Sequence, residues 1–213
     1  MYVVFEGIDG SGKTTIINEL SKDKDLKKHK IIIKKEPFDK NFLESCFKKI
    51  RSWDEKNKAI CLSLAFAYDR VFLEKKFEKY YNKYLVLSDR SFVSSLAYQS
   101  IYIELDWIFC INKFFRKPDL LIYLDVNVEN ALKRIKERSE KGIDYFEKKE
   151  FLEKLKKSYE KILDFLKNKD YKIFKVNANK ELDFVKKEVK KIIIKNLKEQ
   201  IKDQSQKKVR NKK

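Results

Sequence analysis

The stretch that most constrains the fold of this chain is GIDGSGKT, which runs from Gly7 to Thr14 with the spacing G-x-x-x-x-G-K-T. The whole sequence holds only four glycines, and three of them (Gly7, Gly10 and Gly12) fall within this stretch. An apolar run precedes the stretch and a helical pattern follows it. A glycine-rich turn between a strand and a helix directs backbone N–H groups toward phosphate oxygens at the helix N-terminus. The motif therefore predicts a nucleoside triphosphate site.

The phosphate loop supplies the first set of predicted binding residues. Lys13 is expected to reach the β- and γ-phosphates, and Thr14 is expected to bind Mg²⁺. The complete predicted ATP-binding segment is Gly7, Ile8, Asp9, Gly10, Ser11, Gly12, Lys13, Thr14 and Thr15. Asp9 puts a negative charge inside a loop that holds anions, so its carboxylate needs a separate explanation.

The order of apolar runs predicts the fold class. Five short runs have strand character, at residues 2–6, 30–34, 84–88, 120–126 and 171–176. Helical patterns separate them, and near-continuous apolar strands that alternate with helices indicate a parallel sheet covered on both faces. Within 54–82, the helical spacing of Ile60, Leu64, Ala67 and Val71 predicts one buried face; 147–167 repeats the pattern with Phe151, Leu155, Tyr159 and Ile162. We predict an α/β protein with one domain over 1–195 and a flexible basic tail over 196–213.

Composition excludes several classes of protein. No apolar run approaches the roughly 20 residues that span a membrane, and no signal segment is evident, so we expect a cytoplasmic protein. The three cysteines lie far apart in apolar patterns, as small buried side chains do in a reducing compartment. A single histidine argues against a histidine base or a zinc site.

Charge leaves two interpretations open. The formal net charge is +18, and residues 186–213 contain 12 lysines and arginines against 3 acidic residues. A solvated helix with a basic tail would explain this excess. Alternatively, the tail gives the chain a weak, nonspecific attraction to nucleic acid or anionic surfaces.

A second informative stretch, SDRSFVSSLAYQ at residues 88–99, follows the third predicted strand. Ligands of open α/β folds bind at the carboxyl ends of the strands. Asp89 is placed there to hold Mg²⁺ through water, and Arg90 is placed to grip an anion. A capping aspartate beside a surface arginine is the simpler alternative. The pattern N-K-x-D, with which GTPases recognise guanine, is absent, because INKF at 111–114 lacks the aspartate. The sequence therefore does not indicate a GTPase.

Four stretches together carry a family resemblance: FEGIDGSGKTT, LAFAYDR (64–70), SDRSFVSSLAYQ and PDLLIYLDV (118–126). In order and spacing they resemble the thymidylate kinase family over about residues 1–180. The resemblance implies a three-layer P-loop kinase fold with a five-stranded parallel sheet, helices on both faces and a mobile lid. It also implies Mg²⁺-dependent transfer of a phosphoryl group from ATP to dTMP, giving ADP and dTDP, by a homodimer. The aromatic segment 102–115 offers apolar surface for such an assembly.

The same resemblance assigns the acceptor site. Phe66 would stack on thymine and Arg70 would bond the base, and their i, i+4 spacing puts both on one helix face. Arg90 would hold the acceptor phosphate, and Asp9 would accept a hydrogen bond from the sugar 3′-OH. The implied dTMP-binding set is Asp9, Glu36, Pro37, Phe38, Phe66, Arg70, Arg90, Ser95, Tyr98, Gln99 and Tyr145. Without the resemblance, Phe66 reads as a core residue and Glu36-Pro37 as an ordinary loop.

The lid implied by the resemblance is RIKERSEKGIDYFE, at 134–147. Arg138 is the candidate catalytic cation, and Arg134 is expected to contact ATP. The implied catalytic set is Lys13, Asp9, Arg90 and Arg138. A phosphate monoester has a second pKa near 6, so the acceptor is already anionic and needs no general base.

Departures from the family pattern keep two alternatives open. An arginine common beside the Glu-Pro turn is missing, since the neighbours are Lys34, Lys35, Phe38 and Lys40, and lysine cannot grip phosphate as a fork. A related kinase that acts on another nucleotide or on a deoxynucleoside is the first alternative. A basic NTP-binding protein associated with nucleic acid is the second.

Overall fold

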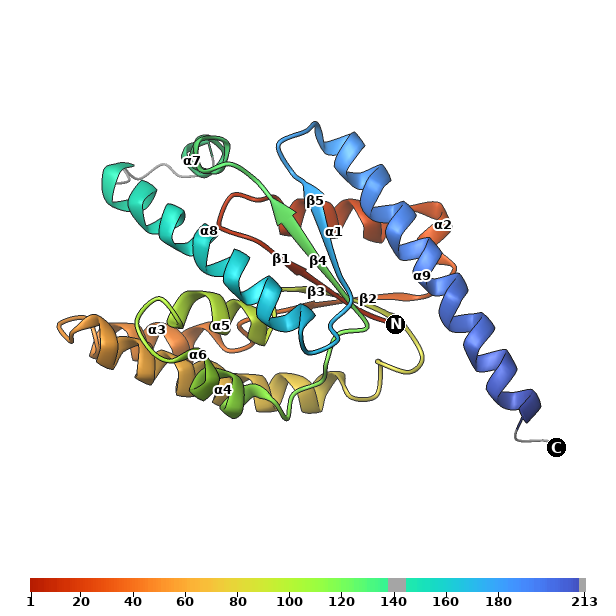
Figure 1. The fold of residues 1–213 in the computed structure, drawn as a ribbon, viewed down its shortest axis with the longest axis horizontal. Helices are drawn as coiled ribbons and strands as arrows, with labels where there is room; N and C mark the ends of the chain where they lie inside the picture. Colours follow the sequence, from red (N-terminus) through yellow and green to blue (C-terminus); the bar gives the residue numbers. More distant parts are fainter. Residues whose placement is uncertain (138–144, 211–213) are drawn as a thin grey trace.

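The computed structural model describes the backbone of residues 1–137 and 145–210, and the side chains of 1–137 and 148–202 (Figure 1). Five strands form one parallel sheet in the order β2-β3-β1-β4-β5. Their bounds are β1 Tyr2–Glu6, β2 Ile31–Lys35, β3 Leu85–Asp89, β4 Leu120–Asp125 and β5 Ile173–Asn177. The five strands predicted from the apolar runs are therefore confirmed.

Helices cover both faces of the sheet (Figure 1). Their bounds are α1 Lys13–Lys22, α2 Lys24–Lys27, α3 Lys40–Lys49, α4 Glu55–Phe77, α5 Phe92–Gln99, α6 Leu105–Asn112, α7 Val128–Lys136, α8 Tyr145–Lys167 and α9 Leu182–Arg210. Helices α1, α2 and α9 pack together on one face, whereas α4, α5, α6 and α8 form the other layer, with α3 against α4. This is the three-layer α/β architecture that the sequence predicts.

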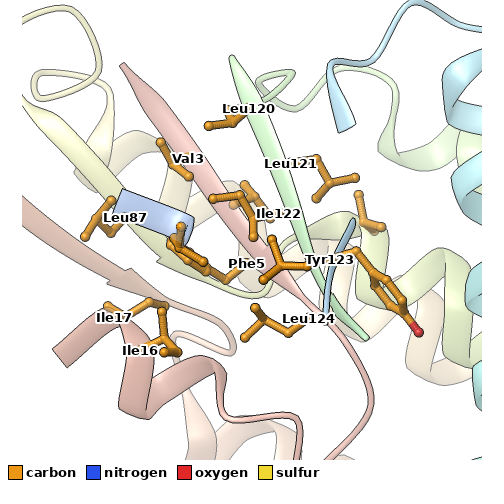
Figure 2. Close-up of a cluster of buried hydrophobic side chains, with 14 of the residues drawn as sticks. Val3, Phe5, Ile16, Ile17, Leu87, Leu120, Leu121, Ile122, Tyr123 and Leu124 are labelled. Atoms are coloured by element: carbon orange, nitrogen blue, oxygen red, sulfur yellow. The ribbon is translucent and has the colours of Figure 1, made fainter. Parts of the chain in front are cut away.

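The core forms on both sides of the central strands (Figure 2). Val3 and Phe5 of β1 are fully buried, and Ile16 and Ile17 of α1 pack in the same cluster. Complete burial of each such side chain stabilises the fold by roughly 1.5–3 kcal/mol. Because β1, β3 and β4 are buried along almost their whole lengths, their carboxyl ends are held firmly where the phosphate loop begins.

Helix α4 departs from the predicted pattern. The sequence predicts that Leu64 and Val71 lie on its buried face, but their exposed fractions are 50% and 55%. The buried face carries Asp69 and Arg70 together with Ala59, Ser63, Ala65, Leu73 and Phe77. The prediction was wrong because this helix packs polar groups against the turn after β2 and against α5 and α6, and leaves apolar side chains on its outer face. In α8, by contrast, Leu155, Tyr159 and Ile162 are buried as predicted.

The last helix continues past the predicted domain boundary. Helix α9 crosses residue 195 without a break, and Asn196 and Leu197 are still buried. The flexibility predicted for 196–213 stays a prediction. Among the helices that the structure describes, none has the length and apolarity needed to cross a membrane.

The cysteines are less buried than the sequence predicts. All three are free thiols, and Cys46 and Cys61 are half-buried. Cys110 lies exposed on α6, so the expectation that all three are buried side chains was wrong. The apolar residues around Cys110 in the sequence did not indicate that Cys110 lies on the exposed face of α6.

Candidate active site

The phosphate loop joins β1 to α1 at the carboxyl edge of the sheet. Gly10 has a φ of +79°, and a Cβ atom there would collide with the backbone of Ala131. Gly12, with a φ of +94°, is the N-cap of α1. L-residues with side chains rarely adopt such left-handed conformations, so both positions require glycine. The glycines bring the loop backbone close to α7 and begin α1 at the phosphate site.

The side chain of Lys13 is folded onto the loop. Its Nζ atom donates hydrogen bonds to the carbonyl oxygens of Gly7 at 2.8 Å and Ile8 at 3.0 Å, and to Ser11 Oγ at 3.3 Å. Lys13 is only 7% exposed, and burial, followed by repulsion from Arg90, lowers its pKa to about 7. A negative charge placed beside this amine would favour its protonated form. The site therefore has a cation that responds to bound phosphate.

Oxygen ligands for a magnesium ion meet at the end of β3. Thr14 Oγ1 donates a hydrogen bond to Asp89 Oδ2 at 2.5 Å, and Lys35 Nζ lies 3.9 Å from the same carboxylate oxygen. A hydroxyl and a carboxylate suit Mg²⁺, which usually keeps water and substrate phosphates as its other ligands. Among the described residues, no cluster of three or more metal-binding His, Cys, Asp or Glu side chains occurs. The residues present fit a nucleotide-bound magnesium ion better than a protein-caged one.

Arg90 follows Asp89 and turns the chain sharply. Its φ is +73°, and its backbone N–H donates to the carbonyl of Phe5 at 3.1 Å, which ties β3 to β1. Its Nη2 donates to Asp9 Oδ1 at 2.6 Å and to Tyr98 Oη at 3.2 Å. Its Nη1 donates to Ser94 Oγ at 3.0 Å. The guanidinium group is thus held in one orientation by three side chains.

The charge of Asp9 is balanced mainly by Arg90. Burial acts to raise the pKa of Asp9, but the fields of Arg90 and then Lys13 outweigh burial and leave that pKa below its ordinary value. The ion pair with Arg90 at 2.6 Å joins two residues that are far apart in the sequence and meet where β1 and β3 end.

Two cavities meet at this point. The smaller has a volume of about 180 Å³ and is lined by the loop residues Gly10, Gly12, Lys13 and Thr14, with Lys35 and Asp89. The larger, of about 780 Å³, extends between α3, α4, α5 and the start of α8. Asp9, Glu36 and Arg90 line both cavities. The loop carboxylate therefore lies on the boundary between a phosphate-loop cavity and a mostly apolar one.

Arg70 is fixed at the base of the larger cavity. Its Nε and Nη2 atoms contact Glu36 Oε2 at 2.9 and 2.8 Å, which makes a forked ion pair. Nη1 donates to Asn112 Oδ1 at 2.5 Å, and Nη2 donates to Ser95 Oγ at 3.2 Å. Glu36 is held in turn by Lys34, whose Nζ lies 3.5 Å from Glu36 Oε1. Every charge in this buried group has an opposite charge beside it, as burial requires.

Most of the predicted acceptor residues line this larger cavity. They are Asp9, Glu36, Pro37, Phe66, Arg70, Arg90, Ser95, Tyr98 and Gln99. Phe66 is half-buried and faces Phe47 of α3 edge-on at a ring distance of 6.4 Å, so it borders the cavity instead of belonging to the core. Among the described residues, Gln99 Oε1 and Glu36 Oε1 are buried oxygens without a hydrogen-bond partner, and both residues line this cavity. These two oxygens are hydrogen-bond acceptors that the cavity can offer a ligand.

Four predicted residues outside the phosphate loop are not among those that line the cavities, and the side chains of two of them lie outside the described residues. The Phe38 ring is exposed, with Lys76 Nζ 4.9 Å from its centroid, and Phe38 lines neither cavity. Arg138 lies outside the described residues, and the side chain of Tyr145 is not described although its backbone begins α8. Arg134 lies behind the loop and donates to the carbonyls of Gly10 at 3.4 Å and Ala178 at 2.8 Å.

Several residues at the site have no counterpart in the sequence-based prediction. Asp69 accepts hydrogen bonds from the backbone N–H groups of Phe38 and Asp39, both at 2.7 Å. Asn112 holds Arg70, and Arg51, after α3, lines the larger cavity. The D-R pair in LAFAYDR was a signal for Asp69. We find no local signal for Asn112 or Arg51, because only the packing of α6 and α3 brings them to the cavity.

Comparison with known proteins identifies close relatives. The sequence matches the family model described as Thymidylate kinase over residues 5–189. A protein named Probable thymidylate kinase from Methanosphaera stadtmanae is 38% identical over 204 residues, covering 93% of this chain and 100% of that protein. Probable thymidylate kinase 1 from Saccharolobus solfataricus is 37% identical over 197 residues, covering 92% and 97% of the two chains. Probable thymidylate kinase from Methanococcus aeolicus is 38% identical over 202 residues, covering 91% and 98%.

Proposed function

The chain belongs to the thymidylate kinase family, and we propose how its residues carry out that family's reaction, transfer of the γ-phosphoryl group of ATP to dTMP. It is a nucleoside monophosphate kinase, and the products are dTDP and ADP. The observation that supports the division of roles below is the position of Asp9 and Arg90, which line both cavities.

The donor site is formed by the phosphate loop in this proposal. Backbone N–H groups of Gly7–Thr15 surround the phosphates of ATP, and Lys13 leaves the carbonyls of Gly7 and Ile8 for the β- and γ-phosphate oxygens. Arg134 supports the loop from behind through its bond to Gly10. Thr14 and Asp89 hold Mg²⁺, Asp89 through water. When bound, the ion supplies neutralisation of the negative charge that builds up on the phosphates.

The acceptor site occupies the larger cavity. Phe66 stacks on thymine, while Arg70, Ser95 and Gln99 meet the edge of the base. Arg90 holds the phosphate of dTMP, Asp9 accepts a hydrogen bond from the 3′-OH, and Tyr98 crowds the 2′ side of the sugar and so favours deoxyribose. Glu36 and Pro37 form the turn that the chain makes past this site. The lid over 134–147 supplies Arg138 as the catalytic cation and Tyr145 as a further residue that binds dTMP.

The chemistry consists of positioning and charge neutralisation. The dTMP phosphate is already anionic near neutral pH, since its second pKa lies near 6, and no side chain has to remove a proton. One of its oxygens forms the new bond to the γ-phosphorus as the bond to the β,γ-bridging oxygen of ATP breaks. Lys13 and Arg90 carry the positive charge at the meeting point of the two cavities. Their shared place near Asp9 sets the distance between donor and acceptor.

We also propose that the chain forms a homodimer through the outer face of α4. Leu64, Tyr68, Val71 and Phe72 are all at least half exposed on this face. Their rings continue into Phe42 of α3, with Phe42–Tyr68 and Tyr68–Phe72 ring distances of 5.3 and 5.1 Å. Contiguous exposed apolar surface of this kind marks a protein interface. The free, partly exposed cysteines support work in a reducing compartment, which we take to be the cytoplasm.

The central experiment is a coupled ADP assay with ATP, Mg²⁺ and a panel of nucleoside monophosphates and deoxynucleosides. We expect dTMP to be the best acceptor and ribonucleotides to be poor ones, because Tyr98 borders the sugar. Brisk turnover of another acceptor without turnover of dTMP would refute the assignment. Arg90→Ala is the companion variant, and it should raise the KM for dTMP while leaving the KM for ATP unchanged.

A further inference from the structure

Glu6 is a fully buried carboxylate that lines neither substrate cavity. It ends β1, directly before the phosphate loop. One of its oxygens, Oε1, accepts hydrogen bonds from Ser91 N at 2.9 Å and Ser91 Oγ at 3.0 Å. The other, Oε2, accepts from Ser94 Oγ at 2.7 Å and Tyr159 Oη at 2.9 Å. Four donors thus converge on two oxygens, as an ionised carboxylate requires.

The hydrogen bonds next to Glu6 have a fixed direction. Arginine nitrogens can only donate, so the bond from Arg90 Nη1 to Ser94 Oγ uses a lone pair of the serine. The single hydroxyl hydrogen of Ser94 must then point to another acceptor: Glu6 Oε2 lies 2.7 Å away, whereas Tyr159 Oη lies 3.3 Å away and itself donates to Glu6 Oε2. Donation therefore runs from Arg90 to Ser94 to Glu6. This series of hydrogen bonds holds the Nη1 end of the Arg90 guanidinium, while Asp9 and Tyr98 hold the Nη2 end.

Burial and the surroundings act on Glu6 in opposite directions. Burial raises the pKa of Glu6 above its ordinary value, whereas the nearby positive charge of Arg90 and the hydroxyl donors work against that rise. Arg90, for its part, has a pKa above its ordinary value although burial opposes its charge, because acidic and phenolic groups surround it, Glu6 among them. Carboxylate and guanidinium therefore favour each other's charged forms across the serine.

We propose that Glu6 is a positioning residue for the acceptor phosphate, which acts through the Ser94 hydroxyl to aim the Arg90 guanidinium at the boundary between the two cavities. The inference rests on the proposed function, in which Arg90 holds the phosphate of dTMP. The inference adds Glu6, which touches no substrate, to the residues that hold the acceptor phosphate. It also explains why a chain in which Arg90 already has Asp9 beside it keeps a second buried carboxylate nearby.

The test compares two variants of the chain with one matched control. Glu6→Gln keeps the size of the side chain. Because Ser91 N–H can only donate a hydrogen bond, the amide oxygen of the glutamine takes the place of Glu6 Oε1. The amide NH₂ then faces Ser94 as a donor, so the serine hydroxyl loses Glu6 as its acceptor and the series of bonds from Arg90 through Ser94 to Glu6 is broken. Ser94→Ala removes the link itself. Each variant should raise the KM for dTMP by about tenfold and leave the KM for ATP unchanged.

Tyr159→Phe is the matched control. It removes one donor from Glu6 Oε2 on the α8 side, together with the 3.3 Å contact between Tyr159 Oη and Ser94 Oγ, and leaves the bonds from Arg90 to Ser94 and from Ser94 to Glu6 intact. The free energy of unfolding should fall while both KM values stay unchanged. A rise in the KM for dTMP equal to that of Glu6→Gln would overturn the inference, because general loosening of the site would then explain both.

The double variant Glu6→Gln/Ser94→Ala tests whether the two residues act through the same series of hydrogen bonds or independently. The effects of residues that act through one such series do not add, so the KM of the double variant for dTMP should equal that of the worse single variant. Multiplied effects would overturn the inference. If Glu6→Gln does not fold, Ser94→Ala and Tyr159→Phe decide: an unchanged KM for dTMP in Ser94→Ala overturns the inference.

Arg90→Ala makes failure of this inference distinct from failure of the proposed function. A raised KM for dTMP in Arg90→Ala, together with unchanged values in Glu6→Gln and Ser94→Ala, overturns only the role of Glu6. An unchanged KM in Arg90→Ala overturns the proposed role of Arg90 and with it the inference.

Discussion

At the scale of the residue, the carboxylate of Asp9 lies where the two cavities of the site meet. Its Oδ1 atom accepts a hydrogen bond from Arg90 Nη2, and Asp9 lines both cavities. An acidic side chain is compatible with an anion-binding loop when a guanidinium group lies 2.6 Å from it. Arg90 thus balances the negative charge that Asp9 puts into the loop.

The first prediction concerns this carboxylate. Asp9→Ala should lower kcat/KM for dTMP on the order of 100-fold, because the acceptor loses the group that sets its distance from the γ-phosphate. The dissociation constant for ATP, measured by calorimetry, should not change. Asp9→Asn, which keeps an oxygen acceptor but loses the charge, should fall between wild type and Asp9→Ala. Loss of ATP affinity with unchanged acceptor kinetics would place Asp9 in the donor site.

The second prediction concerns the buried amine of Lys13. Burial lowers its pKa to about 7, whereas a lysine in the unfolded chain has a pKa of about 10.4. Between these values the unfolded chain binds a proton that the folded chain has released, so this group makes the free energy of unfolding rise with pH. Lys13→Met removes this effect. Relative to the variant, the nucleotide-free wild type should gain about 2 kcal/mol between pH 7 and pH 9.

Denaturant titrations of both proteins at the two pH values measure this gain. The amine of Lys13 donates to the carbonyls of Gly7 and Ile8. A difference between wild type and Lys13→Met that stays constant across this pH range would mean that Lys13 keeps an ordinary pKa.

At the scale of the element, α4 has two functional faces. Its buried face presents Asp69 and Arg70 to the Glu-Pro turn and the acceptor cavity. Its outer face exposes Leu64, Tyr68, Val71 and Phe72. A single helix therefore lines the larger cavity on one side and offers an apolar surface on the other.

The third prediction concerns the hold of α4 on the turn after β2. Asp69→Ala leaves the backbone N–H groups of Phe38 and Asp39 without their acceptor, which should cost about 2 kcal/mol of unfolding free energy. Because the turn carries Glu36, the KM for dTMP should rise as well. Denaturant titration and steady-state kinetics measure the two effects.

Asp54→Ala is the matched control for this prediction. Asp54 caps α4 by accepting from Asn57 N at 3.0 Å, far along the helix from Arg70. Its loss should cost about 1 kcal/mol of unfolding free energy and leave the KM for dTMP unchanged. If Asp69→Ala behaves in the same way, the turn has a structural role alone.

At the scale of the whole molecule, the fourth prediction concerns assembly. Tyr68→Glu puts a charge in the centre of the outer face of α4 and should convert the dimer to a monomer in light scattering. Trp107→Glu is the contrast, since Trp107 is also exposed but lies on α6 within the aromatic segment 102–115. If Trp107→Glu gives a monomer and Tyr68→Glu does not, the interface lies on α6 and not on α4.

The fifth prediction concerns the net charge of +18. Removal of residues 203–213 deletes five basic residues and one acidic residue, and Leu197 stays in place as a buried anchor of α9. The truncated protein should keep its activity and its free energy of unfolding. Binding to single-stranded DNA should weaken and lose part of its salt dependence, by about 0.7 in slope for each phosphate contact removed. An unchanged slope would assign any such binding to the folded domain.

The sequence by itself determined the parts of this protein in which one local rule decides. Three glycines between a strand and a helix fix the phosphate loop, because only glycine accepts the backbone that Gly10 and Gly12 adopt. The apolar runs fix five parallel strands, since strands buried on both faces have no polar alternation. The resemblance carried by the four family stretches then identified nine of the 21 residues that line the larger cavity.

The tertiary structure decided what depends on several elements at once. Helical periodicity in α4 pointed to the wrong face, because apolar spacing does not say whether the neighbouring layer is the sheet, a cavity or another chain. The sequence could not pair Asp9 with Arg90, or Glu6 with Ser94 and Tyr159, since these residues meet only where the ends of β1 and β3 reach α5 and α8. Long-range partners of buried charges follow from three-dimensional packing, which local patterns in the chain do not encode.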